Sequence, residues 1–173
     1  REREDDEGPH APSPVFEASV CGSRAMFYAN LKDFPRAWKW IGKGQSTGRD
    51  KGWIECVRSW TLMSMEDWQG AWEAGISAWE ARPNYPLTAE ILYQMAPRTG
   101  QTAALLDLFG RALPACQSFE TALVMYQLGH ALAELLPDPK GTAEYELARQ
   151  ALERAEALAP MAGEDYRAHL TSL

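Results

Sequence analysis

The sequence contains no apolar run close to the ~20 residues that a helix needs to cross a bilayer. Of its 173 residues, 46% are hydrophobic and 24% are charged, which is typical of a globular protein in water. It does not begin with methionine, and no apolar signal segment stands at its start. We therefore expect a soluble chain without membrane insertion that is a processed product or a piece of something longer. The cytoplasm is the expected compartment, although no residue identifies it.

Cysteine and histidine are scarce, with three residues of each type. The cysteines are far apart in the chain and odd in number, which is typical of buried reduced thiols rather than of a disulfide framework. They are Cys21, Cys56 and Cys116. The histidines have no partner at the spacing of metal ligands, so no metal site is expected.

Motifs that carry catalysis are missing as well. The chain has no Gly-x-Ser-x-Gly turn, no His-Glu-x-x-His helix and no Walker-type loop. The glycine-rich segment 42–48 lacks the Walker spacing, and we interpret it as a loop between helices. Basic and aromatic residues do not interleave, and a net charge of -7 opposes binding to a polyanion. We expect a protein that is not an enzyme, needs no cofactor and binds no nucleic acid.

Alanine and leucine are abundant and β-branched clusters are few, which favours helices over strands. Residues 1–17 differ from the rest because they combine an acidic run with three prolines. Such a segment can bury little apolar surface, so we expect a disordered leader or linker. Residues 18–173 are then expected to form one helical domain.

A similarity at a spacing of about 34 residues runs through the first half of the chain and indicates stacked helical hairpins. It pairs Asp33, Phe34, Ala37 and Trp38 with Asp67, Trp68, Ala71 and Trp72. We call the spacing from Asp33 to Asp67 the repeat period. Proline, glycine and the apolar periodicity place the helix boundaries. The expected helices are Val20–Leu31, Phe34 to Gly42–Gly44, Trp53–Ser64, Asp67–Ala81, Thr88–Ala96, Thr102–Leu113, Glu120–Leu136, Thr142–Ala159 and a last short one within Met161–Leu173.

Small residues recur where paired helices would cross, because two helices approach to ~8–10 Å only when the contact residues lack bulk. The small positions are Ala25, Ser59 and Gly129 in the first helices; Ala37, Ala71 and Ala148 in the second; and Gly44, Ala78, Ala112 and Ala155 further along. The bulky positions beside them are Ile41, Phe109 and Leu152, and closing prolines are Pro83 and Pro160.

This pattern, from about residue 18 to 160, resembles the tetratricopeptide repeat (TPR). The resemblance implies an all-α fold: a right-handed α-solenoid of antiparallel helix pairs, with about four units and a C-terminal capping helix. It also implies a non-enzymatic scaffold that binds a protein or peptide in a concave groove. Three residues depart from the pattern in the second and third units, namely Gly75, Tyr93 and Pro97. The fourth unit needs an insertion of about seven residues relative to the family period.

The resemblance assigns one side of the first helices to the groove. The candidate groove residues are Met26, Trp53, Cys56, Trp60, Met63, Tyr126 and His130. For Trp53 and Trp60, packing between repeats is the alternative to partner binding. The remaining tryptophans at helix contacts are interpreted as core, namely Trp38, Trp68, Trp72 and Trp79. Gly22 and Met26 stand where a carboxylate-binding groove would carry Asn or Lys, so an apolar or aromatic peptide is the expected ligand.

Other hypotheses remain open. Segments 27–31, 80–83 and 89–93 are similar to the helical tail of some family-2 glycosyltransferases, which would make the chain an accessory region of a larger enzyme. Self-association through the open ends of a helical stack is a further possibility. Residues 32–51 carry six cations against two acids, which fits either a solvated surface or an acidic partner.

Overall fold

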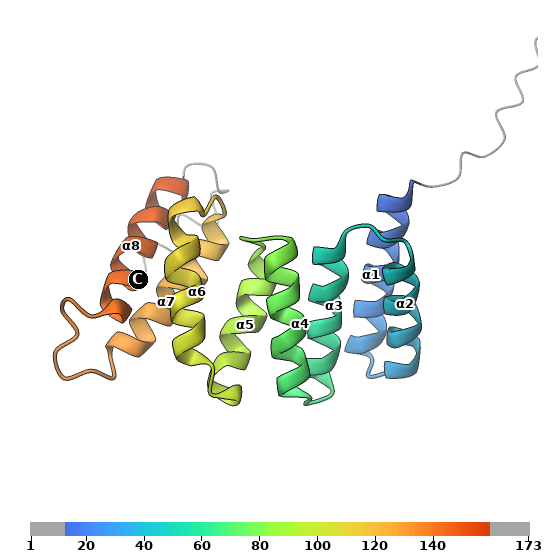
Figure 1. Ribbon diagram of the computed structural model, residues 1–173, viewed down its shortest axis with the longest axis horizontal. Helices are drawn as coiled ribbons and strands as arrows, with labels where there is room; N and C mark the ends of the chain where they lie inside the picture. The colour runs from blue at the N-terminus through green and yellow to red at the C-terminus, as the bar shows by residue number, and fades with distance from the viewer. Residues whose placement is uncertain (1–12, 160–173) are drawn as a thin grey trace, which may run out of the picture.

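The computed structural model describes residues 13–159, and this part of the chain contains α-helices and no strand (Figure 1). The prediction of an all-α protein is confirmed for these residues. The elements are α1 (Pro14–Asn30), α2 (Phe34–Ser46), α3 (Lys51–Ser64), α4 (Trp68–Ala81), α5 (Pro86–Thr99), α6 (Thr102–Ala112), the 3₁₀ helix η1 (Leu113–Ala115), α7 (Phe119–Ala133) and α8 (Ala143–Leu158). The last helix expected from the sequence, within Met161–Leu173, lies outside the described residues.

The helices stand side by side in an elongated row, with α1 and α2 at one end and α8 at the other (Figure 1). Helices α1 and α2, α3 and α4, and α7 and α8 pack as pairs along their lengths. The first helices of successive pairs also touch in series, α1 to α3, α3 to α5 and α5 to α7. Each pair therefore packs mainly on its neighbours in the sequence.

Most of the helices begin at a side chain that caps the first turn. Asp33 Oδ1 accepts a hydrogen bond from the backbone N–H of Arg36, and Asp67 Oδ1 accepts one from Gly70. Thr142 is also an N-cap, because its hydroxyl accepts a hydrogen bond from the N–H of Tyr145 at 3.3 Å. Each such bond satisfies an N–H group that has no partner within the helix.

The repeat period is present in the backbone as well as in the sequence. Lys32, Glu66 and Gly100 all follow the first helix of a pair and all have a positive φ, of 58°, 64° and 69°. Each turn is closed by the same bond from the next N–H to a carbonyl five residues earlier. These bonds are Asp33 N to Tyr28 O at 2.9 Å, Asp67 N to Leu62 O at 3.0 Å and Gln101 N to Ala96 O at 2.8 Å. The turns between the helices of the first three pairs therefore have one geometry.

Gly100 provides a test of this turn. A Cβ added to Gly100 meets nothing within 4 Å, but its φ of 69° is unfavourable for an L-residue with a side chain. We expect Gly100→Ala to lower the free energy of unfolding by about 1 kcal/mol. Gly42→Ala is the matched control, because Gly42 lies in open space within α2 and should gain about 1 kcal/mol from helix propensity. Equal effects in urea denaturation would contradict the assignment of strain to this turn.

Small side chains lie where the paired helices cross, as the sequence predicts. Ala25, Ala37 and Ala71 are all fully buried. Ser59 is buried too, and its hydroxyl donates to the carbonyl of Ala71 at 2.6 Å across the contact between α3 and α4. The small residues thus allow backbone groups of partner helices to approach one another.

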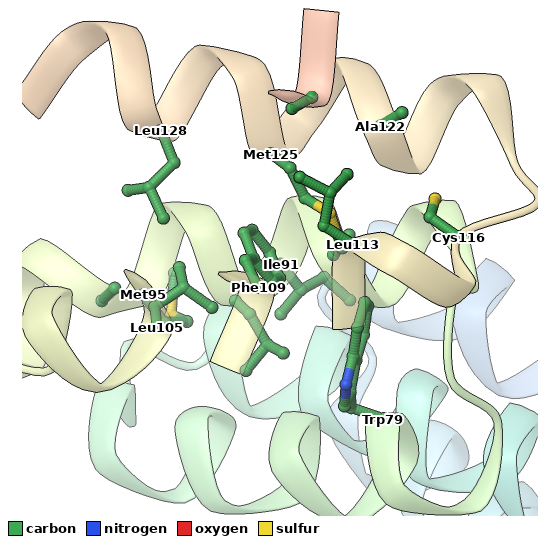
Figure 2. Close-up of a cluster of buried hydrophobic side chains, with 14 of the residues drawn as sticks. Trp79, Ile91, Met95, Leu105, Phe109, Leu113, Cys116, Ala122, Met125 and Leu128 are labelled. Carbon is green, nitrogen blue, oxygen red and sulfur yellow. The ribbon is translucent and has the colours of Figure 1, made fainter. Parts of the chain in front are cut away.

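The main core lies in the middle of the row, where α4, α5, α6, η1 and α7 converge (Figure 2). Trp79 and Phe109 meet there with ring centroids 5.5 Å apart. Of the tryptophans interpreted as core, Trp72 and Trp79 are buried, while Trp38 and Trp68 are half-buried against the core cluster.

Three helix boundaries differ from the expected ones by three residues or more. Helix α1 begins at Pro14, not Val20, because Ser13 caps it, so the expected end of the leader at residue 17 falls inside α1. Helix α5 continues through Pro97 to Thr99, since a proline in the last turn removes only one hydrogen bond. Helix α7 ends at Ala133, three residues before the expected end at Leu136. The segment 42–48, interpreted from the sequence as a loop, is helical up to Ser46, where α2 ends.

Candidate functional site

The seven candidate groove residues form two groups in the structure. Met26 lies on α1, and Trp53, Cys56, Trp60 and Met63 lie on α3. The other two, Tyr126 and His130, lie on α7. Helix α5 touches both α3 and α7 and stands between the two groups. Both groups therefore lie on the first helices of their pairs, and α5 separates one group from the other.

Trp53 packs between units. Its indole Nε1–H donates to the carbonyl of Ser19 on α1 at 3.4 Å, and its ring meets Tyr85 edge-on with centroids 6.2 Å apart. Gly22 leaves the space that the indole fills, because a Cβ at this position would overlap the ring of Trp53. The side chain thus joins α1, α3 and the segment before α5, which favours the packing alternative for Trp53.

Trp60 and Met63 are half-buried and keep part of their surface accessible. The indole Nε1–H of Trp60 donates to Asn30 Oδ1 at 2.9 Å, which fixes the ring against the end of α1. Cys56 is different, since none of its surface is exposed. Burial raises the pKa of the Cys56 thiol to about 11, so the thiol is protonated at neutral pH. Cys56 is thus a core residue that neither a partner nor a reactive substrate reaches.

Tyr126 and His130 pack on each other with ring centroids 5.4 Å apart. They border a hollow of about 290 Å³ between α7 and α8, together with Tyr145, Arg149 and Leu152. Both residues therefore face the second helix of their own pair at the end of the row. Helix α5 stands between them and the surface that Trp60 and Met63 expose on α3.

A larger apolar hollow lies between α5 and α7, and we name it the α5–α7 hollow. Its volume is about 520 Å³, and its lining residues are Tyr93, Gln94, Pro97, Arg98, Thr102, Leu128, Ala131, Leu132 and Leu135. Leu135 is 79% exposed, the highest value among the exposed large apolar side chains of the described residues. An apolar recess with a few polar groups at its border has the general character of a binding site.

The polar groups of the α5–α7 hollow are few. The guanidinium of Arg98 lies over the ring of Trp68, 4.5 Å from its centroid. The amide of Gln94 donates to Glu90 Oε1 at 3.4 Å. The hollow thus offers apolar surface with one fixed cation beside it. It contains no pair of acid and base groups that could transfer a proton during a reaction.

Departures from the repeat pattern point to the α5–α7 hollow. Tyr93 stands where the first helices of the other pairs carry Ala25, Ser59 and Gly129, and α5 and α6 touch along a much shorter stretch than the other pairs. A bulky residue at a crossing point keeps two helices apart. Tyr93 and Pro97, both noted as exceptions in the sequence, line the α5–α7 hollow.

Leu132 and Leu135 were not among the candidate residues, although the sequence holds a signal for Leu135. When Gly129 is aligned with Ser59, Leu135 aligns with Met65, and Met65 follows Leu31 by one repeat period. Leu31 is 62% exposed, Met65 43% and Leu135 79%. An apolar residue thus recurs, exposed, at the end of the first helix in three of the four pairs.

The third departure, Gly75, is explained by packing. A Cβ at Gly75 would lie 2.9 Å from Leu92 Cδ2 and 3.2 Å from Ser59 Oγ. Leu92 of α5 is fully buried and lies beside Gly75, whose counterparts one repeat period before and after are the bulky residues Ile41 and Phe109. Gly75 therefore leaves room for the side chain of Leu92 where α4 packs on α5.

Residues 13–159 hold neither a cluster of metal ligands nor a helix that could span a membrane. No three residues of the types histidine, cysteine, aspartate and glutamate come together in an arrangement that could hold a metal ion. In the same range, no helix combines the length and apolarity needed to span a bilayer.

Comparison with family models, with curated proteins and with solved structures finds no match to this chain. We therefore infer its function from the geometry of its helices and hollows.

Proposed function

We propose that the chain is a non-enzymatic interaction module, a right-handed α-solenoid of TPR-like helix pairs that binds a protein or peptide partner. The turns that recur at the repeat period support this proposal, as does the serial contact of α1, α3, α5 and α7. Stacked helix pairs of this kind present a continuous surface along their first helices, and such surfaces commonly bind peptides.

The α5–α7 hollow is the observation that carries the proposal. It combines a volume of about 520 Å³ with an exposed leucine and one cation, Arg98. A contiguous apolar recess of this kind marks an interaction site more often than isolated apolar residues do. We propose that an apolar peptide side chain enters the recess beside Leu135, and that an acidic group of the same peptide pairs with Arg98.

The candidate groove residues Trp60 and Met63 belong to the same surface. Their counterparts one repeat period later are Gln94 and Pro97, and both line the α5–α7 hollow. The proposed peptide therefore runs along the first helices, with its main anchor between α5 and α7. Trp60 and Met63 provide weaker contacts beyond the anchor.

A peptide selected by display against the folded protein tests this proposal. We expect Leu135→Asp to weaken the affinity for that peptide by about tenfold or more, because a carboxylate would then lie within the apolar recess. Fluorescence anisotropy of the labelled peptide measures the affinity. Leu31→Asp is the matched control, as Leu31 occupies the equivalent position in the first unit and is similarly exposed.

Two results would contradict the proposal. One is a selected peptide whose affinity changes equally in the Leu135→Asp and Leu31→Asp variants. The other is a repeated display selection that yields no peptide at all. Circular dichroism of each variant checks that the helices remain folded.

A further inference from the structure

The outer side of α1 is an apolar surface that no described helix covers. Phe16, Phe27 and Leu31 are 61%, 59% and 62% exposed, and they lie on the side of α1 opposite its buried residues. A hollow of about 630 Å³ opens there, bordered by Ser19, Val20, Ser23, Arg24, Phe27, Tyr28 and Trp40. We call this surface the N-terminal face of the row.

The repeat period shows what kind of element fits the N-terminal face. One period after Val20, Ser23 and Phe27, helix α3 carries their counterparts Ile54, Val57 and Thr61, which are fully or almost fully buried. Ile54 and Val57 form one cluster with Ala25 of α1 and Ile41 of α2, and Ile54 fits into the space left by Gly44. The equivalent side of α3 is thus covered by the preceding helix pair.

Helix α8 lies at the opposite end of the row (Figure 1). Its residues are equivalent, by repeat position, to those with which α2 covers α3. When Ala148 is aligned with Ala37, Leu152 aligns with Ile41, Ala155 with Gly44 and Glu156 with Gln45. Leu152 is half-buried, and it borders the hollow that also includes Tyr126 and His130. We call this surface, formed by Tyr126, His130, Tyr145, Arg149, Leu152 and Glu156, the C-terminal face.

The two faces carry opposite charge. Helix α2 has three cations and no acid, and Arg24 of α1 lies over the ring of Trp40, 4.5 Å from its centroid. Two of the nearby cations have an intramolecular partner, since Lys43 pairs with Glu17 and Arg36 with Asp33. Helix α8 carries four glutamates against two arginines; Glu146 and Glu153 pair with Arg149, and Glu156 is exposed. Attraction between such surfaces steers association and opposes pairing of like faces.

The contact between α2 and α3 also indicates one specific ion pair. Gln45 of α2 donates to Glu55 at 3.2 Å, and Glu55 pairs with Arg58 at 2.9 Å. The counterpart of Gln45 at the C-terminal face is Glu156, and the counterpart of Arg58 at the N-terminal face is Arg24. A carboxylate and a guanidinium therefore occupy corresponding places on the two faces.

We propose that the chain associates head to tail, with the C-terminal face of one copy covering the N-terminal face of the next. The contact repeats between copies the packing of α2 on α3 within one copy, with Leu152 against Val20 and Phe27 and Glu156 beside Arg24. Because the two surfaces are different, the association is heterologous and continues beyond a dimer. This inference is independent of the proposed peptide site.

Sedimentation velocity over a wide range of protein concentration tests the association. The full chain is expected to show an average mass that rises with concentration and falls when salt is added. Phe27→Asp at one face and Leu152→Asp at the other should each give a monomer, whereas Leu135→Asp should associate like the unchanged chain. If Leu152→Asp lowers the helix content, the exposed variant Glu156→Arg replaces it.

A mixture of the Phe27→Asp and Leu152→Asp proteins distinguishes head-to-tail contact from other modes. The Phe27→Asp protein keeps an intact C-terminal face, and the Leu152→Asp protein keeps an intact N-terminal face. These two faces can bind each other, so the mixture should form dimers and no larger species. The proposal is overturned if the unchanged chain is a monomer throughout, if either variant still associates alone, or if the mixture stays monomeric. Symmetric pairing of two N-terminal faces would leave the Leu152→Asp protein able to associate alone.

Discussion

Replacing Gly129 by alanine is expected to lower the free energy of unfolding by about 3 kcal/mol. A Cβ at Gly129 would lie 2.6 Å from the backbone N of Ala148 and 2.7 Å from the carbonyl oxygen of Glu144. Both atoms belong to the backbone of α8, so no side-chain rotation relieves the overlap. Helices α7 and α8 must separate instead, and the close packing of this pair along its length is lost.

Thermal unfolding followed by circular dichroism measures this effect, with an expected decrease in Tm of roughly 6–12 °C for a domain of this size. Gly110→Ala is the matched control. Gly110 lies inside α6, and a Cβ added there meets nothing within 4 Å, so alanine should stabilise the helix by up to about 1 kcal/mol. A Gly129→Ala protein as stable as the unchanged chain would show that α7 and α8 do not cross at this residue.

Phe109→Ala is expected to lower the free energy of unfolding by about 4 kcal/mol. Phe109 has no exposed surface, and it packs against Trp79 in the cluster that joins α4 to α7 (Figure 2). Truncation removes the transfer free energy of the ring and leaves a cavity that the surrounding helices only partly fill. Because α6 has only a short contact with α5, Phe109 and Leu105 provide much of what holds α6 in the row.

The control for this prediction is Phe16→Ala on α1. Phe16 is 61% exposed, so its truncation should change the stability by no more than about 0.5 kcal/mol. Guanidinium denaturation of both variants gives the comparison. Similar losses for Phe109 and Phe16 would mean that α6 is not part of the common core. A loss confined to one phase of a two-phase transition would mean that the row unfolds in separate parts.

The repeat position of a residue could be read from the sequence, and its accessibility could not. The periodic similarity identified Met26, Trp60 and Met63 as side chains on one side of successive first helices, and Gln94 and Pro97 of the α5–α7 hollow occupy the corresponding positions. Cys56 was assigned to the same side, yet it is fully buried. Periodicity gives the direction of a side chain on its own helix, whereas burial also depends on the helices that pack against it.

The sequence alone determined the helical class, the pairing of helices and the composition of their contacts. These features are local, because helix propensity, capping side chains such as Asp33 and Asp67, and small residues at crossing points act over a few turns. The continuation of α5 beyond Pro97 was not predicted; Pro97 lies two residues before the end of the helix, so the distortion that a proline causes is confined to the last turn.

Only the tertiary structure decided which surfaces remain open. Tyr93 borders the α5–α7 hollow, while Trp53 is held against α1 and Tyr85. Leu135 and Phe27 stay exposed because no described helix covers them, although residues of the same character are buried elsewhere in the row. The exposure of a side chain is set by distances between helices that are far apart in the sequence, and no local pattern encodes those distances.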